Sequence, residues 1–530
     1  MRFRTRLLTL ALLLSLAFQA GGQERDALRD YHYIVSTNPF LKLDNAAGIG
    51  RLQLGRIAIA EGQFVKENGG LKGPDDSADD WYTAGVTESY VKVSDKVAFY
   101  GRMHYSYFQG QDMGGSLLAG SSSAPVNFYE TVDSTAALRQ QERYGLTGAM
   151  SYTINDCWSA GVKVNYSSGM RTKLRDPRSR SNLMVLDLTA GIQRTLRSGT
   201  VLGASLAYNR DLEELRARQY GTTDKMFYIF VDYGACYGIR ELFSGDDNFV
   251  ALSNPRYMDN TRLGGSLQLY TKRGGFHQLS YMHRDGYYGK RASSSIVFCE
   301  FSGHEINYSG ETLSRRATAT DRFCWEAAFA TLSNEKNVYK QTTEPGKSTV
   351  VTYFGQNHVL SAMDATIHLA WDAWRGVKDY RAKTAFGATF DGAFHQGITS
   401  IYPYQRTSRI MALNATGHCE RNLVRAHDML SFRGEASFGM GFGNPASDKK
   451  LASSSSPAPL SFDARLNRQF EFETAPRAGL ALGCTYTRIF SEKFSAYVRL
   501  QDGLSLLLRT PQYLDGRLRN AAALTVGCTF

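Results

Sequence analysis

The sequence predicts an all-β fold, a transmembrane antiparallel β-barrel of about 18 strands with long extracellular loops and short periplasmic turns. Three observations lead to this class. They are an export signal at the N-terminus, long segments in which polar and apolar residues alternate, and a terminal strand that ends on an aromatic residue. Strands of such a barrel place every second residue against lipid and the others against water, so their mean hydropathy is low.

The last seven residues form an amphipathic strand. Leu524, Val526, Cys528 and Phe530 share one apolar face, and threonine and glycine occupy the positions between them. This alternation suits a strand with lipid on one side and water on the other. It also resembles the C-terminal signal by which bacterial outer-membrane barrels are recognised and inserted. We therefore expect these four residues to engage the barrel-assembly machinery.

The N-terminus has the pattern of a secretory signal peptide. Three arginines precede an apolar run from Leu7 to Phe18, and small residues follow just before Gln23. A run of about 12 residues is too short to be a permanent membrane helix, which needs about 20. We expect a signal peptide, an N-terminal periplasmic or hatch segment and an outer-membrane β-barrel, over residues 1–22, 23–47 and 48–530.

Composition and charge exclude other classes of protein. Glycine (50) far outnumbers proline (12), aromatic residues make up 12% of the chain, and no second apolar window is long enough for a transmembrane helix. The formal charge of +11 falls to about +8 without the three signal-peptide arginines, because 58 basic residues then stand against 50 acidic ones. These charges are spread along the chain rather than clustered among aromatic residues, so we predict no nucleic-acid partner.

The seven cysteines give no indication of a metal or redox site. Their number is odd, and no two of them have CxxC spacing. Cys484 and Cys528 fall in the apolar register of their strands, where a thiol behaves as a small hydrophobic group. We therefore expect no bound metal and no cofactor.

Alternation of period two runs through most of the chain. In one example, the apolar residues from Leu430 to Phe442 alternate with polar or small residues from Ser431 to Gly441. Such segments run about 10 to 13 residues, longer than the 5 or 6 usual in globular strands and matched to a tilted membrane strand. The predicted strands lie near residues 48–64, 82–93, 97–109, 142–153, 157–169, 182–194, 200–210, 260–270, 275–285, 296–310, 321–334, 357–371, 380–397, 406–419, 426–442, 476–487, 493–508 and 518–530. The weaker patterns between 296 and 397 also allow a count of about 16.

The lengths of the connections indicate the orientation. With the C-terminus in the periplasm, short turns fall on the periplasmic side and long polar connections fall outside, as in other barrels. The short turns lie at Ser94–Lys96, Ile154–Asp156, Thr195–Gly199, Thr271–Gly275 and Ile489–Lys493. The long connections lie near 66–81, 110–141, 211–259, 335–356 and 443–475. The apolar stretch Met226–Tyr237 predicts either a further strand or an extracellular hairpin.

Three short segments resemble a known family. The run from Asn38 to Gly48, the run from Phe108 to Gly115 and the C-terminal Phe530 resemble an uncharacterised family of Bacteroidota outer-membrane β-barrel proteins, described as a domain of unknown function. The resemblance covers nearly the whole mature chain and implies a barrel in a bacterial outer membrane, with no known catalytic residue or substrate. The segment Asn45–Gly48 is also similar to a motif of hydrophobic-compound transporters of the long-chain fatty acid type, in which proline stands where this chain has Ala46.

The sequence offers little that points to catalysis. His283 and Asp285 share a strand face near an outer strand end and could activate a water molecule, although a polar pair at a loop margin explains them better. His304 and Glu305 have no second histidine at helical spacing, so they do not form a zinc-protease motif. We therefore predict that the protein is not an enzyme.

The polar faces of the predicted strands carry the more informative residues. The charged side chains expected to line the pore are Arg102, His104, Lys163, Arg262, Arg433, Glu435 and Arg499. Rings of charge inside large barrels set solute selectivity. An 18-strand barrel is also wide enough for an aqueous channel unless loops plug it.

The sequence thus favours an outer-membrane channel or substrate-uptake pore for small solutes, whose basic interior groups suit anionic ones. Two alternatives remain open: a non-conducting barrel whose long loops bind a partner or scaffold the surface, and a membrane-embedded hydrolase. The expected partners are outer-membrane lipid and lipopolysaccharide, the barrel-assembly machinery and a small solute.

Overall fold

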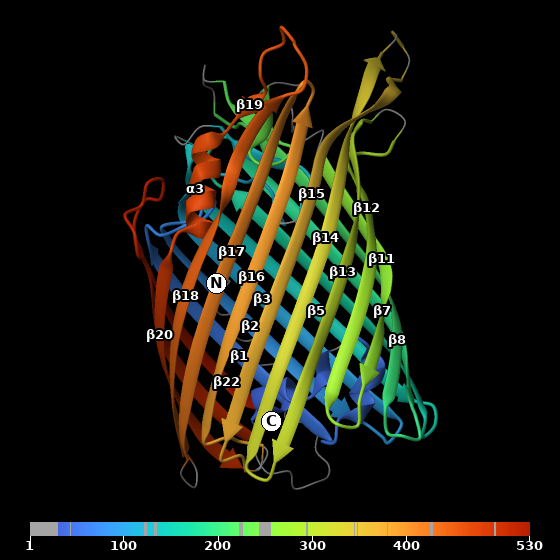
Figure 1. Cartoon of the computed structure of the whole chain (residues 1–530), viewed down its shortest axis with the longest axis vertical. Coiled ribbons are helices and arrows are strands. Elements are labelled where there is room, and N and C mark those ends of the chain that lie inside the picture. Colours follow the sequence, from blue (N-terminus) through green and yellow to red (C-terminus); the bar gives the residue numbers. More distant parts are fainter. Residues whose placement is uncertain are drawn as a thin grey trace.

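The computed structural model describes residues 30–42, 44–120, 124–131, 135–221, 226–242, 256–292, 295–343, 345–346, 348–378, 380–424, 428–491 and 494–530. Within these residues 18 strands form one antiparallel sheet (Figure 1). The sheet closes on itself because its last strand, β22, pairs with its first, β1. The predicted all-β barrel of about 18 strands is confirmed. The predicted signal peptide lies outside the described residues.

The barrel wall is built from strands of 12 to 26 residues, long enough to cross a bilayer with a tilt. They are β1 (Arg56–Gly69), β2 (Asp79–Lys92), β3 (Val97–Met113), β5 (Ala137–Thr153), β6 (Trp158–Lys173), β7 (Arg178–Thr195), β8 (Val201–Arg218), β11 (Arg256–Tyr270), β12 (Gly275–Gly289), β13 (Val297–Arg316), β14 (Ala319–Thr342), β15 (Val350–Arg375), β16 (Thr384–Ile401), β17 (Tyr404–Val424), β18 (Asp428–Lys450), β20 (Arg477–Ser491), β21 (Phe494–Leu507) and β22 (Leu518–Thr529).

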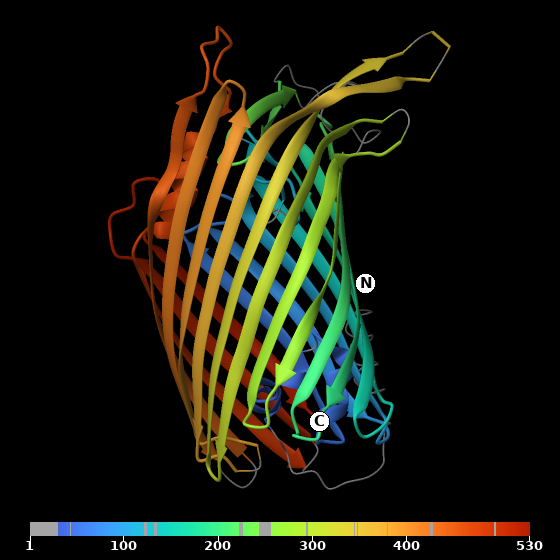
Figure 2. The same ribbon diagram turned by 45° about the vertical axis from the view of Figure 1, so that its right-hand side comes forward.

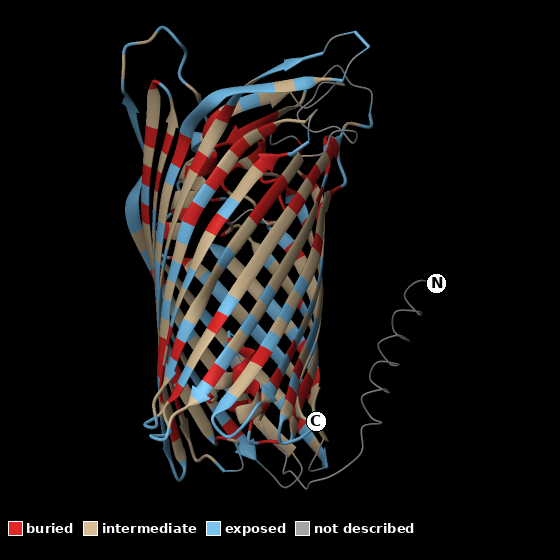
Figure 3. Ribbon diagram, turned by 90° about the vertical axis from the view of Figure 1, so that its right-hand side faces the viewer, coloured by how far each residue is buried: buried red, intermediate tan, exposed pale blue. Residues whose placement is uncertain are grey.

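The wall alternates between an outward apolar face and an inward polar face. In β22 the outward Leu524 and Val526 are 41% and 53% exposed, whereas the inward Thr525 between them is 6% exposed. A barrel places such outward residues against lipid. Buried residues gather toward the two ends of the wall (Figure 3), where other parts of the chain fill the lumen.

Short turns join the strands at one end of the barrel, and most of the longer connections lie at the other end (Figure 1). The first end, here called the turn end, includes the turns 93–96, 154–157 and 271–274. The second, called the loop end, includes the connections 70–78 and 451–476 and the described parts of the connections 114–136 and 219–255. The turns and loops expected from the sequence therefore lie at opposite ends.

Several expected boundaries are wrong, and two of them have a clear physical reason. β1 begins at Arg56 rather than near residue 48, because residues 46–51 form a 3₁₀ helix instead of a strand. The expected connection 335–356 is mostly strand, and the hairpin of β14 and β15 projects past the rim of the barrel (Figure 2). A strand beyond the membrane has water on both faces, so its sequence has no need of alternation.

Part of the loop end folds into the lumen. A second sheet, here called the loop sheet, consists of β4 (Asn127–Glu130), β9 (Tyr228–Asp232), β10 (Tyr237–Leu242) and β19 (Leu460–Ser461). Phe128, Ile229 and Val231 of this sheet pack in one buried cluster with Leu215 and Phe301 of the wall. The apolar stretch at 226–237 thus contributes to the hairpin of β9 and β10. Beside the loop sheet, α3 (Asp463–Thr474) contacts β17 and β18.

The N-terminal segment occupies the turn end. It contains α2 (Tyr31–Ser36), η1 (Pro39–Lys42) and η2 (Ala46–Arg51). Ile34 and Ile49 pack in a buried cluster with Tyr90 and Tyr100 of the wall, and η2 contacts β3, β5, β6 and β7. None of the described helices is long and apolar enough to cross a membrane.

Side-chain caps hold this segment in place. The Asp30 carboxylate accepts the Tyr33 N–H at 3.1 Å and begins α2. Asn45 begins η2 in the same way, since its side-chain oxygen accepts the Ala47 N–H at 3.1 Å. The Asn45 amide also donates to the backbone oxygen of Ile192 at 3.1 Å, which ties the segment to β7.

Candidate functional site

A cavity of about 610 Å³ lies inside the barrel, between α2 and the inward faces of β14–β18 and β20–β22. We call it the vestibule. Its charged lining residues are Asp30, Arg322, Asp372, Arg381, Glu420, Arg433, Glu435 and Arg499, with His32 and His418 beside them. Four guanidinium groups therefore stand with four carboxylates, so the lining has no excess of positive charge for an anionic solute.

Ion pairs organise the charges of the vestibule. Arg433 Nη2 lies 3.1 Å from Glu435 Oε2 on the same strand. Arg322 Nη1 lies 3.4 Å from Asp372 Oδ2, whose other oxygen lies 3.9 Å from His418 Nε2. Because acids and bases alternate around the cavity, it can contact both a cationic and an anionic group of one solute.

Arg499 is held by contacts other than an ion pair. Its Nε donates to Thr485 Oγ1 at 3.4 Å, and its guanidinium carbon lies 5.6 Å from the centre of the Tyr497 ring. Within the described part of the chain, no carboxylate forms an ion pair with it. The Arg499 charge is thus open to an anionic group in the vestibule.

The other residues expected to line the pore lie on the opposite part of the wall. Their registers place Arg102 and His104 on β3, Lys163 on β6 and Arg262 on β11. Arg262 lies in a network of its own, with Nη1 2.7 Å from Asp211 Oδ2 and Nε 2.9 Å from Glu305 Oε1. The structure therefore brings Arg433, Glu435 and Arg499 into one cavity and leaves the other four residues outside it.

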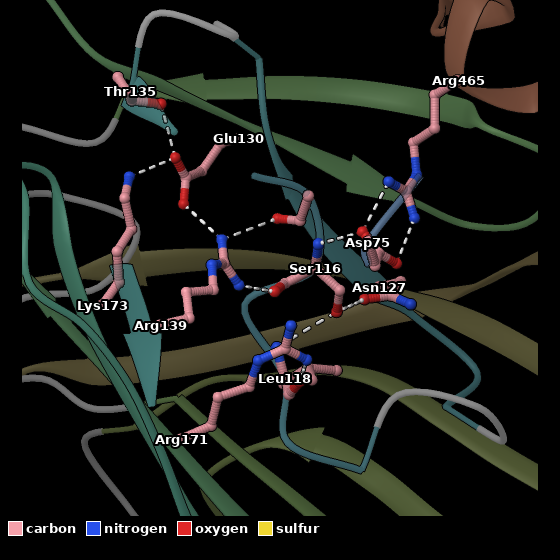
Figure 4. Close-up of polar contacts among 11 residues, drawn as sticks. Asp75, Ser116, Leu118, Asn127, Glu130, Thr135, Arg139, Arg171, Lys173 and Arg465 are labelled. Carbon is pink, nitrogen blue, oxygen red and sulfur yellow. Dashed lines mark hydrogen bonds and ion pairs between the residues drawn. The ribbon is translucent and has the colours of Figure 1, made fainter. Parts of the chain in front are cut away.

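Buried ion pairs join the loops at the loop end (Figure 4). Arg465 of α3 donates from Nη1 to Asp75 Oδ1 at 2.7 Å, and the same carboxylate accepts the Ser116 N–H at 2.9 Å. The Arg465 guanidinium also lies 3.8 Å from the centre of the Tyr129 ring in β4. Three connections that are distant in sequence thus meet at one carboxylate.

A second cluster fastens the loop sheet to the wall (Figure 4). Glu130 of β4 accepts from Arg139 Nη2 at 2.7 Å and from Lys173 Nζ, and these two cations belong to β5 and β6. Arg171 of β6 donates to the backbone oxygen of Leu118 at 3.1 Å. The Arg139 and Lys173 side chains are 1% and 0% exposed, so both cations depend on Glu130 for compensation.

Several carboxyl groups of the loop end have shifted pKa values, among them Asp75 and Asp232. Burial alone would raise the pKa of Asp75, but the Arg465 guanidinium and the Ser116 N–H outweigh it and hold that pKa below the usual range. Burial raises the pKa of Asp232 in β9 to about 6, against the backbone N–H groups of Gly234 and Tyr237 that favour the charged form. Asp232 therefore changes charge within the physiological range.

The outer face carries the histidine–aspartate pair that the sequence singled out, His283 and Asp285. His283 Nε2 lies 2.9 Å from Asp285 Oδ2, and both side chains are well exposed. The His304 ring lies beside them, 5.0 Å from the His283 ring between centroids. Among the described residues, no group of three or more potential ligands could hold a metal ion. All seven cysteines have free thiols.

Sequence reasoning missed the residues that hold the loops in the lumen. Arg139 falls in the expected connection 110–141, and Arg171 and Lys173 lie beyond the strand end expected at 169. Extending the period-two register by a few residues would have placed them on the inward face. The partner of Arg465 lies 390 residues away in the sequence, and no local pattern indicates that pairing.

Solved structures similar to this chain have low sequence identity to it. The ferric preacinetobactin receptor BauA of Acinetobacter baumannii is 9% identical, with 90% of this chain and 79% of that chain covered and a TM-score of 0.39. The ferric citrate transporter FecA is also 9% identical; the match covers 89% of this chain and 78% of that chain, with a TM-score of 0.39. A Pseudomonas aeruginosa FadL homologue is 11% identical; the match covers 92% of this chain and 93% of that chain, with a TM-score of 0.29.

Family membership rests on a sequence match to most of the chain. No protein with curated annotation matches it. Residues 46–530, which include η2 and the whole barrel, match a family of unknown function, DUF6850. The expected kinship with a domain of unknown function is confirmed. The chain belongs to the family of unknown function DUF6850.

Proposed function

We propose that this protein is an outer-membrane barrel that takes up a small solute through its lumen. The observation that carries the proposal is the vestibule, a cavity of about 610 Å³ that remains beside the N-terminal segment and has a charged lining. A barrel that acts only as a scaffold has no need of a charged interior space. The outward apolar band would contact lipid and lipopolysaccharide, and the terminal strand would engage the assembly machinery during insertion.

The lining favours a solute that carries both charges. Arg499 can bind an anionic group, and the paired Arg433 and Glu435 lie in the same cavity. The Asp30 carboxylate, which forms no ion pair with another described residue, is available to a cationic group. A zwitterion of small size therefore matches the vestibule better than a simple anion does.

Passage would require a gate, because both ends of the lumen contain folded chain. The loop sheet packs against the wall at the loop end, and η2 packs against it at the turn end. Uptake by a gated barrel therefore fits better than free diffusion through an open pore. No cofactor and no nucleic acid has a part in this proposal.

Uptake into proteoliposomes tests the proposal. Radiolabelled glycine, acetate and choline serve as a zwitterion, an anion and a cation of similar size. We expect glycine to enter fastest, and the double substitution Arg433→Ala with Arg499→Ala to slow its entry about tenfold, which corresponds to about 1.4 kcal/mol. Equal entry into vesicles with and without the protein would favour the scaffold instead.

A further inference from the structure

Three side chains on the outer face of β14 and β15 form a hydrogen-bonded relay. Glu335 Oε1 lies 2.6 Å from His358 Nδ1, and His358 Nε2 lies 2.8 Å from Ser361 Oγ. The Ser333 hydroxyl donates to the same Glu335 oxygen at 3.1 Å and holds the carboxylate in place. An acid, an imidazole and a serine hydroxyl thus follow one another in the order that nucleophilic catalysis uses.

A β-bulge makes this arrangement possible. Residues three apart on a regular strand point to opposite faces, so His358 and Ser361 would ordinarily be separated by the wall. The register shifts here, since Asn334 pairs with Leu360 and Glu335 pairs with His358, which leaves Val359 as an extra residue. Bulges re-aim side chains and are common next to active sites.

The neighbouring residues show which face is which. Val359 packs in the buried cluster that contains the loop sheet, and Asn334 donates to the backbone oxygen of Pro125 inside the barrel. Glu335 follows Asn334 and His358 precedes Val359, so both point to the opposite face. Their side chains are 33% and 42% exposed, respectively. The relay therefore faces outward.

The hydrogen bonds also determine the protonation pattern. A carboxylate is only an acceptor, so the short contact to Glu335 places a proton on His358 Nδ1. The lone pair of Nε2 is then free to accept the Ser361 hydroxyl. Other histidine–carboxylate pairs of the wall, such as His368 with Asp391 and His395 with Asp364, have no serine hydroxyl on the second nitrogen among the described contacts.

The relay lies at the upper edge of the apolar band. Toward the turn end, the outward residues of β15 and β14 are apolar and exposed, among them Ile367, Trp371, Phe323 and Phe329. Toward the loop end the outward positions become polar, beginning with Ser361, Ser333 and Glu335. In a bilayer this edge is the level of the lipid headgroups and the ester bonds of the acyl chains.

We propose that Ser361, His358 and Glu335 form an active site that hydrolyses carboxylic esters of membrane lipids. His358 Nε2 takes the hydroxyl proton as Ser361 Oγ bonds to the ester carbonyl carbon, and the resulting tetrahedral intermediate expels the alcohol, which takes that proton from His358. Water then attacks the acyl-serine and gives its proton to His358. As the fatty acid leaves, the serine regains the proton, so one ester and one water yield one acid and one alcohol.

This inference is independent of solute uptake and departs from the expectation that the protein is not an enzyme. Glu335 does not touch the reacting atoms in this scheme. It acts as a positioning residue that orients the imidazole. The pair His283 and Asp285, which the sequence singled out, has a different place on the wall and serves as a control.

The test uses the full-length folded protein in phosphatidylethanolamine vesicles, with release of free fatty acid as one readout. A fluorophosphonate, which phosphonylates activated serines, gives the second readout by peptide mass spectrometry. The variants are Ser361→Ala, His358→Ala and Glu335→Gln, with Ser302→Ala and His283→Ala as matched outward-facing controls. Every variant is first checked for the wild-type mobility shift between unheated and boiled gel samples.

We expect the phosphonate on Ser361 and no fatty-acid release from Ser361→Ala. His358→Ala should lower release about 10²-fold to 10⁴-fold, the usual contribution of a general base. Glu335→Gln should lower kcat and leave KM within about twofold, because the residue acts through the imidazole. Both controls should retain wild-type release. Folded wild-type protein without phosphonate on Ser361, or release that persists in Ser361→Ala, would overturn the assignment.

Discussion

Replacing Arg465 with methionine tests whether the loops gate the lumen. Methionine keeps the apolar length of the side chain and removes the charge that compensates Asp75. The Arg465 and Asp75 side chains are 6% and 30% exposed, so their ion pair is largely shielded from water. The variant leaves the Asp75 carboxylate with the Ser116 N–H as its remaining hydrogen bond at 2.9 Å.

The expected cost follows from these contacts. Removing one partner of a buried pair costs about 3–5 kcal/mol, and the partial exposure of Asp75 places this pair near the lower value. Loss of the guanidinium from the Tyr129 ring adds about 1 kcal/mol. A closed loop end destabilised by about 4 kcal/mol opens about 10³-fold more often.

Single-channel recording in planar bilayers measures this change directly. We expect Arg465→Met to raise the open fraction about 10³-fold. The double variant Asp75→Asn with Arg465→Met should recover much of the closure, because no uncompensated charge is then buried. Arg488→Met, which breaks an exposed ion pair with Asp428 at the turn end, serves as the control and should behave as wild type. If Arg465→Met stays closed, or the double variant opens as often as the single one, the Asp75–Arg465 pair does not gate the lumen.

Three further predictions concern other parts of the lumen. Arg499→Glu adds a fifth carboxylate to the vestibule lining, so reversal potentials of the opened channel should shift toward cation selectivity; an unchanged potential would place Arg499 outside the conduction path. Gly161→Val should release the N-terminal segment, since a Cβ at residue 161 would stand 2.2 Å from Ala47 N. Trypsin should then cleave the variant after Arg51, and equal resistance of the variant and the wild type to this cleavage would contradict the docking. The pKa of Asp232 is raised to about 6 from an unfolded value near 4, so its contribution to stability is complete below about pH 4 and is lost as the pH rises through 6. This amounts to about 3 kcal/mol. The protection of β9 amides, measured relative to the intrinsic exchange rate at each pH, should therefore fall between pH 5 and pH 8 in wild type but not in Asp232→Asn.

The wall could be predicted because a membrane imposes its pattern locally. Leu430 to Phe442 alternates with polar residues, and each alternation indicates both a strand and its inward face. The same rule fails where lipid is absent. β14 continues to Thr342 through polar sequence, and the loop sheet joins β4 to β9 across about 100 residues without any repeating signal.

The candidate sites could be predicted only in part, for the same reason. Inward registers for Arg433, Glu435 and Arg499 follow from alternation, and these residues do meet in the vestibule. Which charges pair across the lumen depends on strand order and on loops that fold inward, as with Asp75 and Arg465. Simple alternation places His358 and Ser361 on opposite faces of the wall. The sequence therefore could not predict their contact, which depends on the single bulge residue Val359.

Membrane insertion as a closed barrel underlies both proposals, solute uptake and ester hydrolysis. The most direct measurement is the gel mobility of the protein from the purified outer-membrane fraction, unheated and boiled. A closed wall whose last strand pairs with its first predicts a compact form that migrates differently until boiling unfolds it. A protein found in the soluble fraction, or one whose mobility is the same before and after boiling, would contradict an outer-membrane barrel.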